Sequence, residues 1–152
     1  MNNDNVVTIS GRIGSDPELK FIPSGHAVCE FSLAHSRRKK DGDEWVDDIT
    51  HWFRVVSWRK LAEMSANLPK GAAVRVTGKL VQETWDTAEG EKRSIVKVVA
   101  DSIDLQISTV KDIESTRGRV TLVWGGNGPP PVSNEFEMDV ADGGGSFGND
   151  PF

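Results

Sequence analysis

Three tryptophans in this sequence share the parity of positively charged residues within segments that favour β-strands. Because burying a guanidinium in a small core is costly, the strand face that carries both is expected to face water. Exposed indole rings beside cations suit a flexible polyanion with aromatic faces: the rings stack on bases and the cations pair with phosphates. The residues concerned are Trp52, Arg54 and Trp58 in ITHWFRVVSW and Arg75, Lys79 and Trp85 in AAVRVTGKLVQETW.

A structural interpretation of the same tryptophans has to be weighed. A loop or a neighbouring subunit covers many outward-facing tryptophans, and for any single one that is as good an explanation as binding. Three tryptophans with bases on two separate strands favour an interaction surface. Trp45 lies in a charged segment and could pack back on the core, and Trp124 is expected to be structural or at an interface.

Two further groups of bases are candidates for contact with a phosphate backbone. A run of four bases follows a predicted strand and precedes DGDE, whose acids oppose its charge. Most charge runs are only solvated loops, but this position suits an arm that tracks a backbone. A second and weaker pair lies on the next predicted hairpin. The candidates are Arg37, Arg38, Lys39 and Lys40 in the run and Lys92 and Arg93 in the pair.

The hydrophobic periodicity indicates an all-β domain that positions these residues. Strand-like alternation occurs over residues 6–13, 26–36, 49–58, 72–85 and 94–105, and helical spacing over residues 59–68. We expect RRKKDGDEWVDD to form an exposed hairpin loop. Five strands with one short helix between the third and fourth match an OB-fold, a five-stranded Greek-key barrel.

The chain divides into a domain and a tail. Residues 1–124 hold 18 bases and 18 acids, with one extra β-like run at 117–124, whereas residues 125–152 hold five acids and no base. The body is therefore neutral, which weakens the argument that a net charge of −5 makes against a nucleic-acid partner. Residues 125–152 are rich in Gly and Pro and are expected to be a disordered acidic tail.

Several function classes find no support in the sequence. The histidines His26, His35 and His51 lack metal-ligand spacing, and no Gly-rich phosphate loop precedes a helix. We therefore expect no enzyme, no metal and no cofactor. The single cysteine, Cys29, fits a reducing compartment, and neither a membrane span nor a signal peptide is apparent. A cytoplasmic, nucleoid-associated protein is expected.

Over residues 6–105 the chain resembles the bacterial single-stranded DNA-binding proteins. The resemblance rests on VTISGRIGSDPELKFIPSG, WFRVVSW with LAE, KGAAVRVTGKL and TWDTAEGEKR. The segment around Trp45 and the β-like region after residue 105 resemble versions from high-GC Gram-positive bacteria or their phages. The resemblance implies an OB-fold that assembles as a homotetramer and binds single strands without sequence preference. It places stacking aromatics at Trp52, Trp58 and Trp85, and a further one near Lys39, where this chain has a base.

The end of the chain carries a second implication of the resemblance. Family members end in an acidic tip with Pro-Phe, which docks on replication, recombination and repair proteins; here the tip is Asp150, Pro151 and Phe152. A terminal ring can fill an apolar pocket while its carboxylate meets a base. The tip departs from the family pattern, since Asp150 stands in place of the usual Ile and few acids flank it.

An alternative from another class remains open at this point. The domain could be an interaction or assembly factor of the primosome accessory type, whose outward aromatics form a protein interface and which contacts DNA only incidentally. Salt dependence separates the two, because binding to a polyanion weakens steeply with salt and an apolar interface does not.

Overall fold

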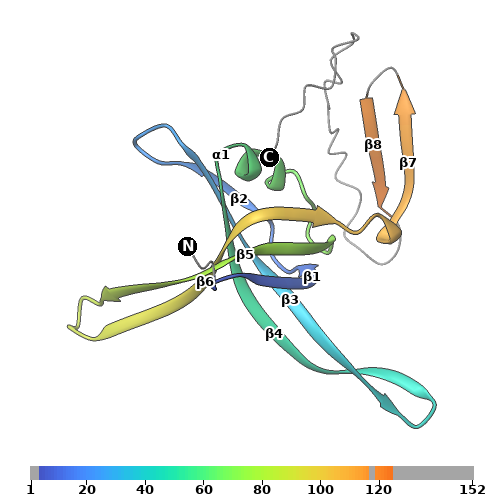
Figure 1. Cartoon of the computed structure of the whole chain (residues 1–152), viewed down its shortest axis with the longest axis horizontal. Helices are drawn as coiled ribbons and strands as arrows, with labels where there is room; N and C mark the ends of the chain where they lie inside the picture. The colour runs from blue at the N-terminus through green and yellow to red at the C-terminus, as the bar shows by residue number, and fades with distance from the viewer. Residues whose placement is uncertain (1–3, 117–118, 125–152) are drawn as a thin grey trace.

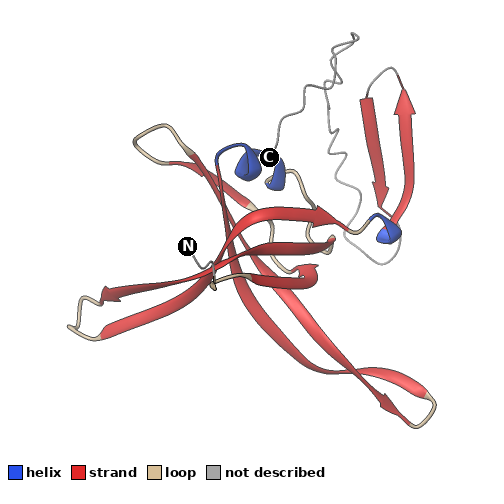
Figure 2. Cartoon of the chain, in the orientation of Figure 1, coloured by secondary structure: helices blue, strands red, loops and turns tan. Residues whose placement is uncertain are grey.

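The computed structural model describes residues 4–116 and 119–124, and most of these lie in β-strands (Figure 2). One short helix lies between the third and fourth of the strands predicted from periodicity, so the all-β prediction with its single helix is confirmed. In chain order the elements are β1 (Val7–Ile13), β2 (Glu18–Phe21), β3 (Ala27–Asp41), β4 (Glu44–Trp58), α1 (Arg59–Ser65), β5 (Ala73–Asp86), β6 (Lys92–Leu105), a 3-10 turn (Ile107–Thr109), β7 (Val110–Thr116) and β8 (Arg119–Trp124).

The pairings of the five long strands close on themselves. The sheet order is β1-β5-β6-β4-β3-β2, and β1 also pairs with β3 (Figure 1). All pairings in this sheet are antiparallel except that between β4 and β6. Gly11 makes the β1–β3 contact feasible, because a Cβ there would collide with the carbonyl group of Ala34. The strand order and the single helix agree with the predicted OB-fold.

The hydrophobic core lies inside the closed arrangement of these five strands, and its strand residues follow from the alternation of side chains along each strand. Successive side chains of a strand point to opposite faces, so every second residue turns inward. Fully buried side chains come from β1, β3, β4, β5 and β6, and the largest are Ile13, Leu33, Val55, Val74, Val76 and Val98.

Helix α1 covers the start of β3. Ala62 of α1 packs with Ala27 and Cys29, and all three are buried. The hydroxyl groups of Ser57 and Ser65 lie 2.8 Å apart, so the two buried polar side chains satisfy each other. Burial raises the pKa of the Cys29 thiol.

Two hairpins extend past the core as arms. In Figure 1 the β3–β4 arm points to the lower right and the β5–β6 arm to the left. The expected loop at RRKKDGDEWVDD is wrong in extent, because strands continue to Asp41 and resume at Glu44. Gly42, with φ of 64°, supplies the tight turn. Since both faces of an arm meet water, Ile49 and Leu80, which share the inward parity of their strands, are 50% and 44% exposed.

Three short strands were predicted incompletely or not at all. β2 pairs with β3 although DPELKF carries no clear alternation. The extra strand expected at 117–124 is β8, and its partner β7 was not predicted; together they form a separate two-stranded sheet. Trp124 packs against the core, which agrees with its expected structural role. The predicted disordered tail, residues 125–152, lies outside the described residues.

No helix within the described ranges is long and apolar enough to cross a membrane.

Candidate nucleic-acid interface

The outer face of β4 carries two of the three predicted tryptophans. Trp52 pairs with Ala34 and Trp58 with Val28 of β3, and both indoles face away from the core. Their exposed fractions are 62% and 42%, respectively. They are six positions apart, which corresponds to about 20 Å along a strand. The parity prediction for this strand is confirmed at both rings.

The third tryptophan lies on the β5–β6 arm and belongs to the same outer face. Trp85 is 46% exposed and pairs across the strands with Arg93. Lys79 points outward from the same strand six residues earlier. The β4–β6 and β5–β6 registers place Arg54, Lys97 and Val81 in one row, so the outer sides of β4 and β5 form one continuous surface. We call this surface, from Trp52 and Trp58 to Trp85, the tryptophan face.

The ring of Trp52 rests on a glycine. A Cβ built at Gly14 would lie 3.0 Å from Cη2 of Trp52 and closer still to Cζ3. It would also lie 3.2 Å from Oγ of Ser32. The bare backbone of Gly14 therefore lets the indole settle against the end of β1 while most of the side chain stays open to solvent.

An ion network occupies the middle of the tryptophan face. Nη1 of Arg54 lies 3.2 Å from Oε1 of Glu30, and Nζ of Lys97 lies 3.6 Å from the same oxygen. Lys97 also lies 2.9 Å from Oε2 of Glu83, and its side chain is only 14% exposed. Sequence reasoning named Arg54 alone. The other three members come together only through the strand register, so a single segment carries no signal for them.

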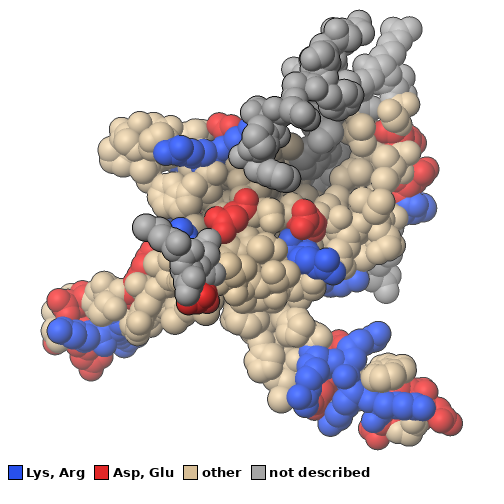
Figure 3. Space-filling view, in the orientation of Figure 1, with Lys and Arg blue, Asp and Glu red and all other residues tan. Residues whose placement is uncertain are grey.

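The four bases predicted as an arm lie near the tip of the β3–β4 hairpin, where Figure 3 shows Lys and Arg gathered with acids among them. The strand register shifts between Arg37 and Arg38, so Asp48 of β4 has no partner in the register. Asp48 lies 2.9 Å from Arg37 and 3.0 Å from Lys39, and these hydrogen bonds hold the pKa of its carboxyl below the ordinary value.

The other two bases of the run differ from each other. Nε of Arg38 lies 3.3 Å from Asp47. Lys40 has no ion pair within the described residues, and it pairs across the hairpin with Trp45. Trp45 is exposed, so it does not pack back on the core as one alternative allowed. Three of the four cations are therefore partly neutralised by carboxylates of the same hairpin.

Two predicted bases lie away from the tryptophan face. Arg75 keeps the outward parity of Lys79 and Trp85 but lies at the end of β5 beside β1, where it pairs with Ser10 and its Nε donates a 3.4 Å hydrogen bond to the Ser10 hydroxyl. Lys92 pairs with Asp86, so its side chain takes the face of the arm opposite to the one that carries Trp85 and its partner Arg93. The structure thus brings together Trp52, Trp58, Trp85, Arg54, Lys79 and Arg93, with the Arg37–Lys40 run on the adjoining arm.

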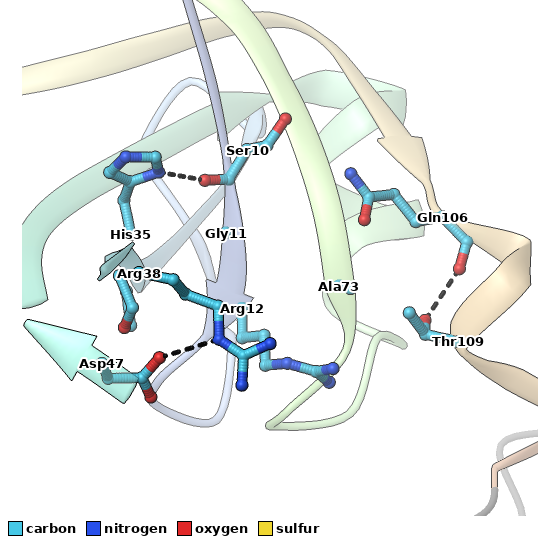
Figure 4. A pocket seen from close by; sticks show the side chains of 11 residues that line it. Ser10, Gly11, Arg12, His35, Arg38, Asp47, Ala73, Gln106 and Thr109 are labelled. Carbon is cyan, nitrogen blue, oxygen red and sulfur yellow. Dashed lines mark hydrogen bonds and ion pairs between the residues drawn. The ribbon is translucent and has the colours of Figure 1, made fainter. Parts of the chain in front are cut away.

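A polar cleft of about 520 Å³ lies where the β3–β4 arm leaves the core. Figure 4 shows Arg12, His35 and Arg38 along it. His35 shares a 2.7 Å hydrogen bond with the Ser10 carbonyl oxygen through Nδ1, and Arg12 donates one of 2.9 Å to the Gly71 carbonyl. The cleft extends the basic surface of the arm towards β1. Arg12 was missed because its segment carries no aromatic or basic neighbour.

The described residues offer no metal centre. No group of three or more His, Cys, Asp or Glu side chains within 4–116 and 119–124 is arranged to hold an ion. His26 and His51 are exposed, and neither belongs to a cluster of potential metal ligands within the described residues. The predicted docking tip, Asp150, Pro151 and Phe152, lies outside the part of the chain that the structure describes.

Comparison with known proteins gives one consistent result. The sequence model described as "Single-strand binding protein family" matches residues 4–106. The single-stranded DNA-binding proteins of Mycolicibacterium smegmatis and Mycobacterium tuberculosis are each 39% identical over 122 residues, covering 77% of this chain and 74% of theirs. That of Treponema pallidum is 41% identical over 106 residues, covering 69% and 59%.

The fold comparison agrees with the sequence comparison. A crystal structure of a small single-stranded DNA-binding protein from Streptomyces coelicolor superposes with a TM-score of 0.59 at 26% identity. The superposition covers 68% of this chain and 94% of the other. These relatives are named for binding and not for a reaction, in line with the expectation that the chain is not an enzyme. The resemblance to actinobacterial versions is confirmed by the mycobacterial matches.

Proposed function

The chain belongs to the single-strand binding protein family, and on this premise we propose that it binds single-stranded DNA without sequence preference through the tryptophan face. The observation that carries the proposal is the exposure of Trp52, Trp58 and Trp85 on one continuous outer surface. An unpaired base offers a π-face whatever its identity, so rings of this kind bind single strands of any sequence.

Stacking supplies the sequence-independent part of the affinity. In proteins that bind single strands, this family among them, each base stacked on an aromatic side chain contributes roughly 1–3 kcal/mol. Trp52 is already held against Gly14, so it loses little conformational freedom on binding.

Phosphate contacts supply the salt-dependent part of the DNA affinity, and to form they have to displace existing ion pairs within the protein. Arg54 is paired with Glu30, and Arg37 and Lys39 are paired with Asp48. A phosphate that takes one of these cations leaves a carboxylate without its partner. We infer that these carboxylates lower affinity and favour release, and that Lys40 and Lys79, which have no ion pair among the described residues, contact the backbone at less cost.

The stacking role is tested by truncating rings on and off the tryptophan face. Trp52→Ala is expected to weaken binding of a dT oligomer about 5- to 140-fold, which corresponds to roughly 1–3 kcal/mol, and to reduce fluorescence quenching. Phe21→Ala is the matched control, because Phe21 is 64% exposed but pairs with the buried Ala27 on the other face of the sheet. Equal affinities of Trp52→Ala and the wild type would refute the role assigned to this ring.

The second part of the proposal concerns the C-terminal tip. We propose that Asp150, Pro151 and Phe152 recruit replication, recombination and repair proteins, with the ring in an apolar pocket and the terminal carboxylate beside a base of the partner. Deleting Pro151 and Phe152 should leave DNA affinity unchanged and abolish recovery of helicases or exonucleases in a pull-down. Recovery that survives the deletion would contradict this role.

We further propose that the chain protects single strands during replication, recombination and repair, that it acts at the nucleoid in the cytoplasm, and that it assembles as a homotetramer. Light scattering on the free protein and on its dT complex tests the assembly, and a mass other than that of four chains would refute it. The alternative function, a protein-assembly factor with incidental DNA contact, requires a weak response of DNA binding to salt. A log K against log salt plot with a slope near zero would favour that alternative.

A further inference from the structure

Arg59 has a backbone conformation that the sequence elsewhere reserves for glycine. Its φ is 57°, in the left-handed region, where an L side chain is strained. The other described residues with positive φ are Gly25, Gly42, Gly71 and Gly90. A Cβ at any of these glycines would meet no atom within 4 Å, so the φ angle and not crowding explains their identity. Arg59 is the exception to this rule.

The fold itself gives no reason for an arginine at this junction. Arg59 begins α1 directly after β4, and its side chain is exposed. The Arg59 side chain makes no hydrogen bond or ion pair with any residue in the ranges 4–116 and 119–124. A glycine would reach the same φ without strain, so the side chain does not act by holding the fold together.

The position of Arg59 next to Trp58 suggests what the side chain does. Trp58 is the last residue of β4 and lies on the tryptophan face. The strand register puts Lys20 in the same row across the sheet, but Lys20 lies 3.2 Å from Glu18. Arg54, four residues before Trp58, is held by Glu30. Arg59 thus adds a cation without a partner among the described residues directly after Trp58 in the chain.

We propose that Arg59 binds the phosphate of the nucleotide that stacks on Trp58, and that the chain tolerates a strained backbone to place this cation there. The proposal rests on the proposed function and adds a residue to it. In this role Arg59 lowers the stability of the free protein, because its strained backbone raises the free energy of the folded state and only the contact with bound DNA offsets that strain.

The test measures stability and DNA binding on the same variants. Arg59→Gly removes both strain and charge. Its Tm should rise by about 2 °C or more. Its affinity for a dT oligomer should fall about two- to fivefold, and its log K against log salt slope should shrink by about 0.7, the value for one phosphate on a single strand. Arg59→Lys keeps the charge and the strain and should retain the wild-type slope.

A charge-matched control removes a cation elsewhere. Lys111 lies exposed on β7, outside the tryptophan face, so Lys111→Gln should change neither Tm nor slope. A higher Tm of Arg59→Gly with unchanged affinity and slope would overturn the proposal while leaving the function intact. An unchanged or lower Tm would overturn the strain argument. The function itself fails only if the wild-type protein does not bind the oligomer.

Discussion

Gly14→Ala displaces the ring of Trp52 without removing it. The added Cβ would lie 3.0 Å from Cη2 and closer to Cζ3, whereas carbon atoms in contact are about 3.5–4.0 Å apart. Because Cζ3 is the closer atom, the ring has to move by more than about 1 Å or turn to relieve the overlap. Cζ3 and Cη2 lie at the far end of the side chain, so the indole yields and the backbone stays in place. The free energy of unfolding should therefore change by less than about 0.5 kcal/mol.

The loss of affinity has an upper bound in the full stack. Complete loss of the Trp52 stack would cost about 3 kcal/mol at most, or about 140-fold. A displaced ring keeps part of the overlap with the base, and we expect about 1 kcal/mol, a fivefold loss. Gly14 itself offers no side chain to DNA, so the effect has to pass through Trp52.

A double-mutant cycle isolates this route. Binding of a dT oligomer is titrated for the wild type, Gly14→Ala, Trp52→Ala and the double variant, and near-UV circular dichroism reports the movement of the indole. Gly14→Ala should weaken the wild type and have no further effect in the Trp52→Ala background. An equal loss in both backgrounds, or full affinity together with a displaced ring, would refute the claim that the contact with Gly14 positions the Trp52 indole for stacking.

Two further substitutions test the electrostatics of the arm and the closure of the sheet. Asp48→Asn frees Arg37 and Lys39, so dT affinity should rise and the log K against log salt slope should steepen by up to about 1.4, and an unchanged slope would contradict the proposed competition. Because the folded-state pKa of Asp48 is lowered, its ionised carboxylate stabilises the fold above the unfolded-state pKa of about 3.9. Urea titrations should therefore show the wild type more stable than Asp48→Asn at pH 7. This difference should be lost as the pH falls through the folded-state pKa. Gly78→Ala places a Cβ 2.8 Å from the carbonyl carbon of Val99, a backbone atom that cannot yield, and should lower the free energy of unfolding by about 2–3 kcal/mol in urea titrations; wild-type stability would contradict the close approach of β5 and β6.

The sequence predicts the tryptophan face because its signal is local. Alternation within one strand places Trp52, Arg54 and Trp58 on the same side, and a guanidinium excludes that side from the core. The helix is equally local, since a change of period and the following PKG mark it. The burial of Ile49 and Leu80 cannot be predicted in this way. Alternation indicates which face of the strand a side chain takes, but not how far along the strand the core extends.

The partners of the predicted cations depend on distant pairings. Glu30 and Glu83 reach Arg54 and Lys97 because four strands, β3 to β6, are in a particular register. Asp48 reaches Arg37 and Lys39 because the register shifts beside it. Period-two patterns do not encode a shift of one residue in a solvated arm, where neither face is buried. The positive φ of Arg59 has no sequence signal either, since glycine or asparagine would be expected there.

Photochemical cross-linking of a dT oligomer to the full-length protein, followed by mass spectrometry of the linked peptides, tests the central claim most directly. Cross-links are expected on the peptides that contain Trp52, Trp58 and Trp85, and high salt should reduce them together. Links confined to the β7–β8 sheet or to β2, with these three peptides unmodified, would contradict an interface built on the tryptophan face.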